Sequence, residues 1–220
     1  MAEPQRIAVI GVGKVGAPLA AQLARAGHHV VIGESRPGSD SARRAVARDA
    51  RLSVRSVEEA VAGSEIVFLA TPFGAAEGVL TPLATALAGK VLVDCTNPIG
   101  PNMAHLFASA KSGSAMVQEA APGAHVVKAF TVYGFENLEN STYPGYDVRP
   151  AMPICGDSPI AKAIVAGLAR DCGFEPVDVG SLAQAVHLEH MTLLWIRMVR
   201  IERLVPDLTW AALRRPIGAS

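Results

Sequence analysis

The sequence has few aromatic residues and no net charge, and each shortage argues against a class of function. Aromatic residues make up 5% of the chain, which leaves little for the base-stacking surfaces of proteins that bind single-stranded nucleic acid. Twenty basic residues balance twenty acidic ones, so the whole chain is not attracted to nucleic acid or to an anionic membrane. We therefore expect neither a nucleic-acid partner nor a membrane partner.

Metal-ligand patterns and long apolar runs are also scarce. The three cysteines, Cys95, Cys155 and Cys172, form no C-x-x-C pair, which argues against zinc and thioredoxin chemistry. His187 and His190 are spaced i, i+3, but the sequence places no third ligand beside them. We expect no bound metal, and reduced thiols in a cytoplasmic protein. The chain begins without the features of a signal segment, and charges interrupt its apolar runs before the ~18 residues typical of a membrane span.

A glycine-rich turn stands between an apolar run and a segment with the composition of a helix. Residues 11–16 read Gly-Val-Gly-Lys-Val-Gly and precede an alanine-rich segment, 18–26. In a strand–turn–helix unit, Gly11 permits the tight turn, Gly13 lets a pyrophosphate approach the backbone, and Gly16 lets the helix pack closely. The N–H groups at the start of the helix then face the phosphates. We expect a dinucleotide coenzyme at Gly11, Val12, Gly13, Lys14, Val15 and Gly16.

The second apolar segment carries the residues that distinguish NAD from NADP. Residues 30–33 are followed by Glu34, at about the ~20-residue distance at which an acid contacts the ribose hydroxyls of NAD. Arg36 stands where an arginine would contact the 2′-phosphate of NADP. With Ser35 between these two residues, the sequence leaves both coenzymes open.

Two later loops follow predicted strands at their carboxyl ends, where ligands bind in open α/β sheets. One follows the strand 65–70 and the other the strand 90–94. An ordinary turn is the alternative for the first loop, and Asn97 of the second can cap a turn as well as bind ribose or nicotinamide. We expect coenzyme contacts from Ala70, Thr71, Pro72, Asn97 and Pro98.

Strands alternate with helices over residues 6–130, and about six such strands are present. This alternation predicts an α/β fold with a Rossmann-type doubly wound parallel sheet. Helices are expected at residues 18–26, 41–50, 57–62, 79–88 and 115–121.

The remainder predicts a small C-terminal α/β extension, residues 134–220, after a dinucleotide-binding domain over residues 1–133. It begins with an irregular segment, 134–150, and continues as strand, helix and strand. It ends in a long helix over 182–205 and a shorter one near 208–213. The long helix has a large apolar face, more typical of a core or a subunit interface than of a cofactor site. We expect a homodimer through this helix.

Several short segments of the chain together match a known family pattern: 10–16, 27–33, 70–72, 96–98, 127–130, 154–157, 178–182 and 193–197. Through these segments the chain resembles the coenzyme F420-dependent NADP oxidoreductases, in which hydride passes between nicotinamide and a deazaflavin ring. The family implies NADP as the coenzyme, with NAD as the alternative that the residues leave open, and a deazaflavin or flavin as the co-substrate.

Some positions depart from the family pattern. The glycine loop matches, but Glu34 stands in the position of the family's serine, which displaces Ser35 and Arg36 by one. Thr131 replaces the usual asparagine and His190 a proline. These last changes fall near the expected acceptor pocket, so the resemblance implies a relative with an altered small-molecule acceptor.

The leading interpretation is an NAD(P)H-dependent oxidoreductase that passes hydride to a flavin- or deazaflavin-like acceptor. Such a transfer needs two aligned rings and no strong general acid, and the sequence shows no catalytic residue. A carbonyl or imine acceptor would need a proton donor, for which Lys128, Tyr133 and His125 are the nearest candidates. Hydroxyacid dehydrogenases carry a helical second domain that is too large for the residues after Phe130. A non-catalytic dinucleotide sensor would share the glycine loop.

Overall fold

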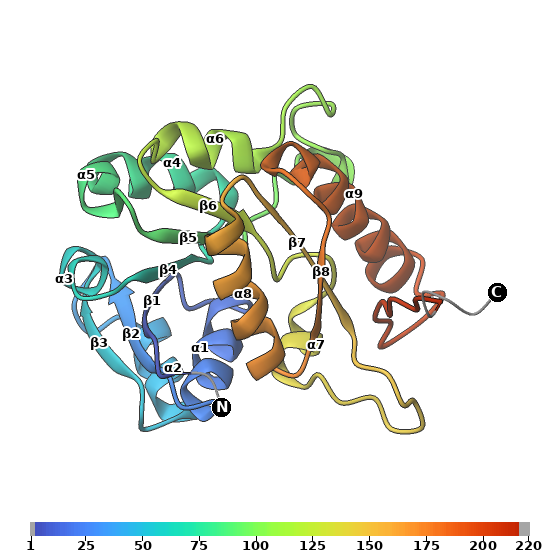
Figure 1. Cartoon of the computed structure of the whole chain (residues 1–220), viewed down its shortest axis with the longest axis horizontal. Coiled ribbons are helices and arrows are strands. Elements are labelled where there is room, and N and C mark those ends of the chain that lie inside the picture. Colours follow the sequence, from blue (N-terminus) through green and yellow to red (C-terminus); the bar gives the residue numbers. More distant parts are fainter. Residues whose placement is uncertain (1–2, 216–220) are drawn as a thin grey trace.

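The computed structural model describes residues 3–215, which form one eight-stranded sheet with helices on both faces (Figure 1). The strand order is β3-β2-β1-β4-β5-β6-β7-β8. Neighbouring strands pair in parallel, apart from the antiparallel pair β6 and β7. The strands are β1 (Arg6–Ile10), β2 (His29–Glu34), β3 (Ser53–Ser56), β4 (Ile66–Leu69), β5 (Val91–Asp94), β6 (His125–Lys128), β7 (Ala151–Gly156) and β8 (Glu175–Asp178). The predicted Rossmann-type α/β fold is confirmed.

The helices divide into two layers, each with its own apolar core. They are α1 (Gly16–Arg25), α2 (Asp40–Arg48), α3 (Val57–Ala62), α4 (Ala76–Leu80), α5 (Ala84–Leu87), α6 (Gly113–Ala120), α7 (Phe135–Glu139), α8 (Pro159–Asp171) and α9 (Ala185–Ile196). One core joins side chains of α1, α2, α8 and α9 to the sheet, and the other joins α3, α4, α5 and α6. Strands covered on both faces are continuously apolar, as β4 is, because a parallel sheet is buried on both sides.

The predicted helix over 79–88 is interrupted in the structure. A 3₁₀ turn, Thr81–Leu83, separates α4 from α5 and contains Pro82. Proline lacks the N–H of a helical hydrogen bond, and its ring meets the preceding turn, so the helix cannot run through it. The segment 134–150, expected to be irregular, contains the short helix α7, whose Glu139 carbonyl accepts from Gln22 of α1.

The C-terminal part is helical over 182–201 and has no regular secondary structure from there to residue 215. A 3₁₀ turn, Leu182–Gln184, leads into α9, and a π-helical turn, Arg197–Ile201, ends it. The predicted helix near 208–213 is wrong. Leu208 and Trp210 instead offer their carbonyls to the Trp195 indole N–H and to the Ala151 N–H, which ties this segment beside α9 and the start of β7. Over residues 3–215, no helix combines the length and the apolar character needed to span a bilayer.

Candidate functional site

The glycine turn after β1 is closed on its inner side and open on its outer side. Gly11 has φ +88°, and a Cβ there would lie 2.7 Å from the Thr71 nitrogen. A Cβ on Gly16 would lie 1.9 Å from the Gly11 carbonyl oxygen, so the helix packs directly on the turn. A Cβ on Gly13 would meet no atom within 4 Å. The tight turn and the close packing predicted for these glycines are present, and Gly13 is left facing free space.

Helix α1 begins at this turn without a competing side chain. Its N-cap residue, Val15, makes no side-chain hydrogen bond to the first turn, and that turn contains no acidic residue. The first N–H groups of a helix lack intrahelical partners and carry the positive end of its dipole. The exposed backbone at Gly13 and the start of α1 therefore form a cradle that suits a phosphate.

Glu34, the last residue of β2, binds the loop that follows it. Its carboxylate accepts hydrogen bonds from the backbone N–H of Gly38 at 3.0 Å, and from the N–H and Oγ of Ser39, each at 3.1 Å. The two backbone N–H groups hold the pKa of the Glu34 carboxyl below its ordinary value. Ser39 also caps helix α2 by accepting from Ala42 N. One carboxylate thus shapes the loop that presents Ser35 and Arg36.

Three hollows surround the glycine turn and the end of β2. A cavity of about 160 Å³ brings Gly11, Glu34, Ser35, Arg36 and Thr71 together. A hollow of about 520 Å³ continues from Glu34, with apolar walls that include Val57, Val79 and Leu83. The third, of about 440 Å³, has Gly13, Lys14, Ser41, Arg44 and Arg48 in its wall.

The basic face of α2 lines this site, although the sequence pattern does not assign its residues to the coenzyme. Ser41, Arg44 and Arg48 follow the i, i+3, i+7 spacing of one helix face, and that face lines the hollow beside Gly13. The spacing is visible in the sequence. The side of α2 that faces Gly13 is set by the packing of α2 against α1, through Ala42 and Ala45 in the shared core.

The carboxyl ends of β4, β5 and β6 each hold a polar side-chain atom that is buried without a partner. These atoms are Thr71 Oγ1, Asn97 Oδ1 and Thr131 Oγ1. Their three strands are neighbours in the sheet, and a buried polar atom without a partner costs free energy. These three atoms therefore mark a candidate ligand-binding surface at the carboxyl edge of the sheet.

Thr131 is absent from the residues that the sequence pattern assigns to the coenzyme. The residue before it, Phe130, is buried and has a φ of +59°, a conformation that is rare for bulky residues and that concentrates at functional sites. A strand pattern gives no sign of such a reversal, so the direction of Thr131 could not be read from the sequence.

Beneath these loops lies a fully buried ion cluster. Lys128 Nζ lies 3.2 Å from Asp94 Oδ2 and 3.5 Å from Glu189 Oε1, and the three side chains are at most 1% exposed. Lys128 Nζ also donates to the Thr96 carbonyl. Asp94 and Lys128 end β5 and β6, and Glu189 comes from α9.

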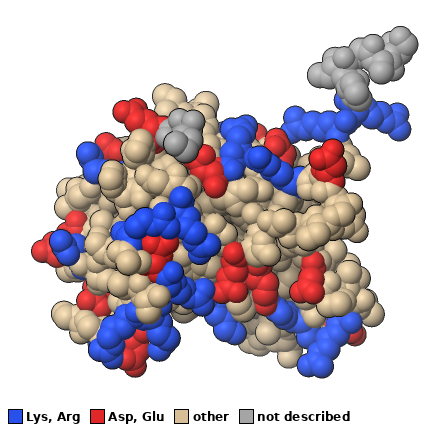
Figure 2. Space-filling view, turned by 90° about the horizontal axis from the view of Figure 1, so that it is seen from below, with Lys and Arg blue, Asp and Glu red and all other residues tan. Residues whose placement is uncertain are grey.

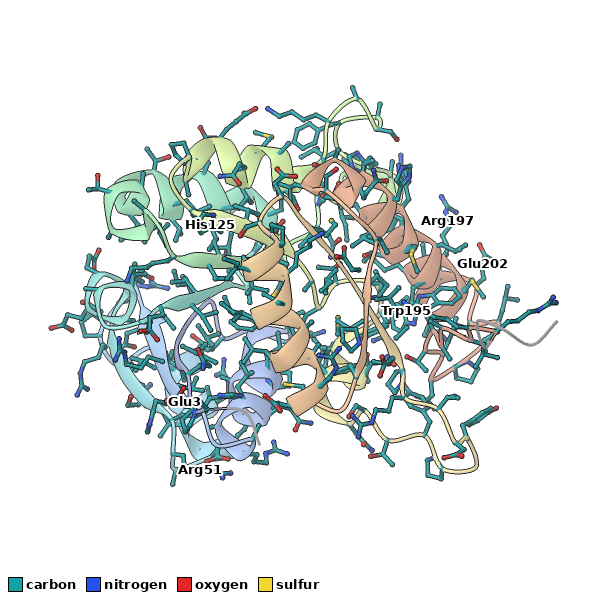
Figure 3. The ribbon with its side chains drawn as sticks, viewed as in Figure 1. Glu3, Arg51, His125, Trp195, Arg197 and Glu202 are labelled. Carbon is teal, nitrogen blue, oxygen red and sulfur yellow. The ribbon has the colours of Figure 1, made fainter. Side chains whose placement is uncertain are left out.

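The three proton donors considered from sequence are not placed to serve an acceptor. Lys128 is held inside the ion cluster. Tyr133 is buried with its hydroxyl toward Met152 Sδ, and burial raises its pKa well above the ordinary value. His125 is the first residue of β6, at the opposite end of the strand from Lys128 (Figure 3).

One member of the histidine pair of α9, His190, is bound by neighbouring side chains. His190 Nε2 lies 2.7 Å from Ser109 Oγ, and its ring stacks on His105. No cluster of three or more His, Cys, Asp or Glu side chains suited to a metal occurs within residues 3–215.

The glycine-turn half of the chain has a clear family match. Residues 6–98 match the family model described as NADP oxidoreductase, coenzyme F420-dependent. The match covers somewhat less than half of the chain and begins at the first strand. The matched residues contain β1 to β5 and every residue that the sequence pattern assigns to the coenzyme.

Two solved structures share the architecture over most of their length. A proposed F420-dependent NADP reductase from Arthrobacter sp. FB24 superposes with a TM-score of 0.79 at 28% identity, covering 89% of this chain and 93% of that one. A hypothetical protein from Sinorhizobium meliloti superposes with a TM-score of 0.75 at 25% identity, covering 94% and 96%. The resemblance seen in the sequence is therefore confirmed.

A longer relative shares the same part of the chain. Metalloreductase STEAP3 of Rattus norvegicus is 34% identical over 191 residues, which cover 87% of this chain and 37% of that protein. The chain thus spans little more than a third of the length of this relative. The matched family is one of NADP-dependent oxidoreductases, and the longer relative is a reductase by name.

Proposed function

We propose that the protein is an NADPH-dependent oxidoreductase that passes hydride to a flavin- or deazaflavin-like ring. The family match and the open cradle at Gly13 support a dinucleotide coenzyme. Bound NADPH supplies the hydride, and the chain supplies the binding surface and the alignment of the two rings.

Each part of the coenzyme has a matching surface. The pyrophosphate fits the backbone at Gly13 and the start of α1. The adenine fits the apolar hollow beside Val57 and Leu83. The nicotinamide fits the carboxyl ends of β4 to β6, where Thr71, Asn97 and Thr131 have unpartnered atoms.

We propose NADP rather than NAD, because the Glu34 carboxylate is already bound by its own loop. An acid that selects NAD accepts from the ribose hydroxyls, but Glu34 accepts three hydrogen bonds from Gly38 and Ser39. Arg36 and Ser35 share a cavity with Gly11, where an arginine suits a 2′-phosphate. Arg44 adds a second guanidinium beside Gly13.

The single observation that carries the choice of acceptor is that Lys128, Tyr133 and His125 all lie outside the open site. Reduction of a carbonyl or imine adds hydride to the carbon and a proton to the adjacent oxygen or nitrogen, and a positioned side chain normally supplies that proton. A flavin-like ring accepts hydride at its central ring and takes its proton at a separate ring nitrogen, which water can supply. The Phe73 and Phe107 rings, 5.8 Å apart beside the Pro98 loop, offer an aromatic surface for such an acceptor.

We further propose that the two parts of the chain have different roles. Residues 1–133 bind the coenzyme, and residues 134–220 complete the acceptor side and form a homodimer through the C-terminal helix. The apolar side chains of Leu194, Ile201 and Leu204 are about half exposed or more, which fits a subunit contact. The three cysteines are free and buried, which fits a protein of the reducing cytoplasm.

A stopped-flow experiment tests the function. The purified protein is mixed with NADPH and, in turn, with FMN, the deazaflavin F420 and a cyclic imine, and the absorbance of the reduced nicotinamide is followed. We expect rapid oxidation with a flavin-type ring and none with the imine. NADPH that binds tightly without being oxidised by any ring would instead indicate a dinucleotide sensor.

A further inference from the structure

The ion cluster beneath the nicotinamide loops contains more negative than positive charge. Two carboxylates, Asp94 and Glu189, face one ammonium, Lys128, and all three are buried. Burying an incompletely paired charge is costly. The protonation state of each member follows from its hydrogen-bond partners.

Asp94 is an ionised carboxylate, because donors fill all its acceptor positions. Oδ1 accepts from Thr96 N at 2.9 Å and from Thr96 Oγ1 at 2.6 Å. Oδ2 accepts from Ser114 Oγ at 2.6 Å and from Lys128 Nζ at 3.2 Å. A carboxylate has about four lone-pair sites, so these four donors leave no room for a proton.

His105 is a neutral donor to Glu189. Its Nδ1 accepts from the backbone N–H groups of Phe107 and Ser109, each at 3.3 Å, so this nitrogen carries no proton. The proton therefore lies on Nε2, which is 2.7 Å from Glu189 Oε2. Glu189 Oε1 accepts from Ser114 N and faces Lys128. Every partner of Glu189 is a donor, so its carboxyl is ionised too.

Lys162 is a second ammonium near Cys155, but Asp178 pairs with it at 2.9 Å, so it adds no net positive charge to the cluster. Burial raises the pKa of the Cys95 thiol above its ordinary value and that of Cys155, paired with Lys128 across β6 and β7, to about 12, so both are uncharged. His190 lies on the outer side of His105. The N-terminal end of α6, whose Ser114 N–H points at Glu189, offsets part of the charge. The cluster therefore keeps a net negative charge.

The ion cluster and the helix α9 that carries Glu189 contact two of the three loops whose unpartnered polar atoms suit the nicotinamide. Lys128 donates to the carbonyl of Thr96, the residue before Asn97. On the other side, Thr192 of α9 donates to the carbonyl of Thr131 at 2.8 Å. The negative charge of the ion cluster thus lies beneath the loops proposed to hold the nicotinamide ring, and the sheet and α9 shield it from solvent.

We propose that Asp94 and Glu189 act as a built-in counter-charge for the nicotinamide ring, which becomes positive when its hydride leaves. They are positioning residues that favour the oxidised coenzyme through the field they create. The inference rests on the proposed function, because it requires a nicotinamide coenzyme at these loops. It predicts that the protein binds NADP⁺ more tightly, relative to NADPH, than it would without the buried charge.

The test is the ratio of the dissociation constants of NADP⁺ and NADPH, measured by calorimetry and by fluorescence titration. Glu189→Gln removes one negative charge, and we expect it to raise this ratio roughly tenfold, as one charge at about 10 Å would do at an effective dielectric near 20. Asp94→Asn should shift the ratio in the same direction. Glu189→Asp and Ser114→Ala keep the charge and should leave the ratio unchanged.

The ratio separates an electrostatic effect from a structural one, because a damaged site loses affinity for both coenzymes alike. If circular dichroism shows that Glu189→Gln does not fold, the ratio of dissociation constants measured for Asp94→Asn tests the proposal instead. An unchanged ratio in a folded charge-removing variant that binds NADPH overturns the counter-charge and leaves the proposed function standing. Failure of the unmodified protein to bind either coenzyme overturns both.

Discussion

At the scale of single residues, Gly13 is a position where the fold has room for a side chain but a bound pyrophosphate would not. Gly11 and Gly16 have backbone atoms pressed against the place of a Cβ, but Gly13 has none within 4 Å. A side chain at Gly13 would therefore leave the fold intact and occupy the space that suits the pyrophosphate. This separation makes Gly13 a clean test of the coenzyme site.

We expect Gly13→Val to lower NADPH affinity by roughly 100-fold or more, since two hydrogen bonds to a charged phosphate contribute about 1.5 kcal/mol each. Thermal unfolding should show nearly the same midpoint as the unmodified chain. Gly167→Val is the matched control, because Gly167 also has open space around its Cβ position but lies on α8. Unchanged NADPH affinity in a folded Gly13→Val protein would contradict the assignment.

The sequence predicts residue roles well where the backbone alone decides them. The turn at Gly11 and the packing at Gly16 follow from spacing, because only glycine fits there. Thr131 could not be predicted, since its direction depends on the positive φ of Phe130. The pairing of Glu189 with Lys128 joins positions 61 residues apart, and no local pattern indicates such a contact.

At the scale of elements, the loop between β2 and α2 is organised by the carboxylate of Glu34. The carboxylate accepts from Gly38 and Ser39, and Ser39 caps α2. A glutamine would offer one acceptor oxygen, and its amide would meet an N–H donor. The loop and the first turn of α2 therefore depend on the charged form of one side chain.

We expect Glu34→Gln to lower the unfolding midpoint and the NADP⁺ affinity at pH 7, and the difference in midpoint to vanish in acid. The folded-state pKa of Glu34 lies below its ordinary value of 4.5, so its stabilisation is present above pH 4.5 and is lost as the pH falls through the folded value. Thermal unfolding between pH 7 and pH 3 measures this. Glu119→Gln, which removes an exposed partner of Lys111, should show a much smaller change. A specific loss of NADH affinity would show instead that Glu34 binds ribose.

Element boundaries were predictable where the chain carries a local signal and were missed where long-range contacts decide. The helix α3 is found as predicted, because Ser56 and Glu59 form a capping box at its start. The break between α4 and α5 has a local cause, Pro82. The irregular segment after residue 207 has no local signal in the sequence, because its carbonyls are bound by Trp195 and Ala151 from other parts of the chain.

At the scale of the whole molecule, the surface has no large region of one charge on the face shown in Figure 2, where basic and acidic side chains are interspersed. This agrees with the zero net charge of the chain. Attraction of a charged partner by a large patch of one sign is therefore not expected on this face. The most exposed apolar surface near α9 includes Leu194 at 50% and Leu204 at 69%.

The arrangement at the end of α9 favours a second copy of the chain on this surface. Trp195 is buried, and its indole N–H is bound to Leu208, so it belongs to the core. Arg197 and Glu202 project outward near the C-terminal end of α9 (Figure 3), and Leu194 and Ile201, which are close to them in sequence, are about half exposed. Opposite charges flanking apolar side chains are the pattern of an interface with a polar rim.

We expect Leu194→Glu combined with Ile201→Glu to convert a homodimer into a monomer, because the two introduced charges would be buried against each other in the contact. Light scattering after size-exclusion chromatography measures the mass, and circular dichroism confirms the fold. Ile160→Glu is the control, since Ile160 is 76% exposed on α8 and its replacement should leave the mass unchanged. A dimer that survives the double substitution would place the subunit contact elsewhere, and an unmodified chain that is already monomeric would remove the dimer from the proposal.

Truncation at Leu193 would not give this answer, because it also removes the core residue Trp195 and would unfold the molecule whichever surface forms the contact.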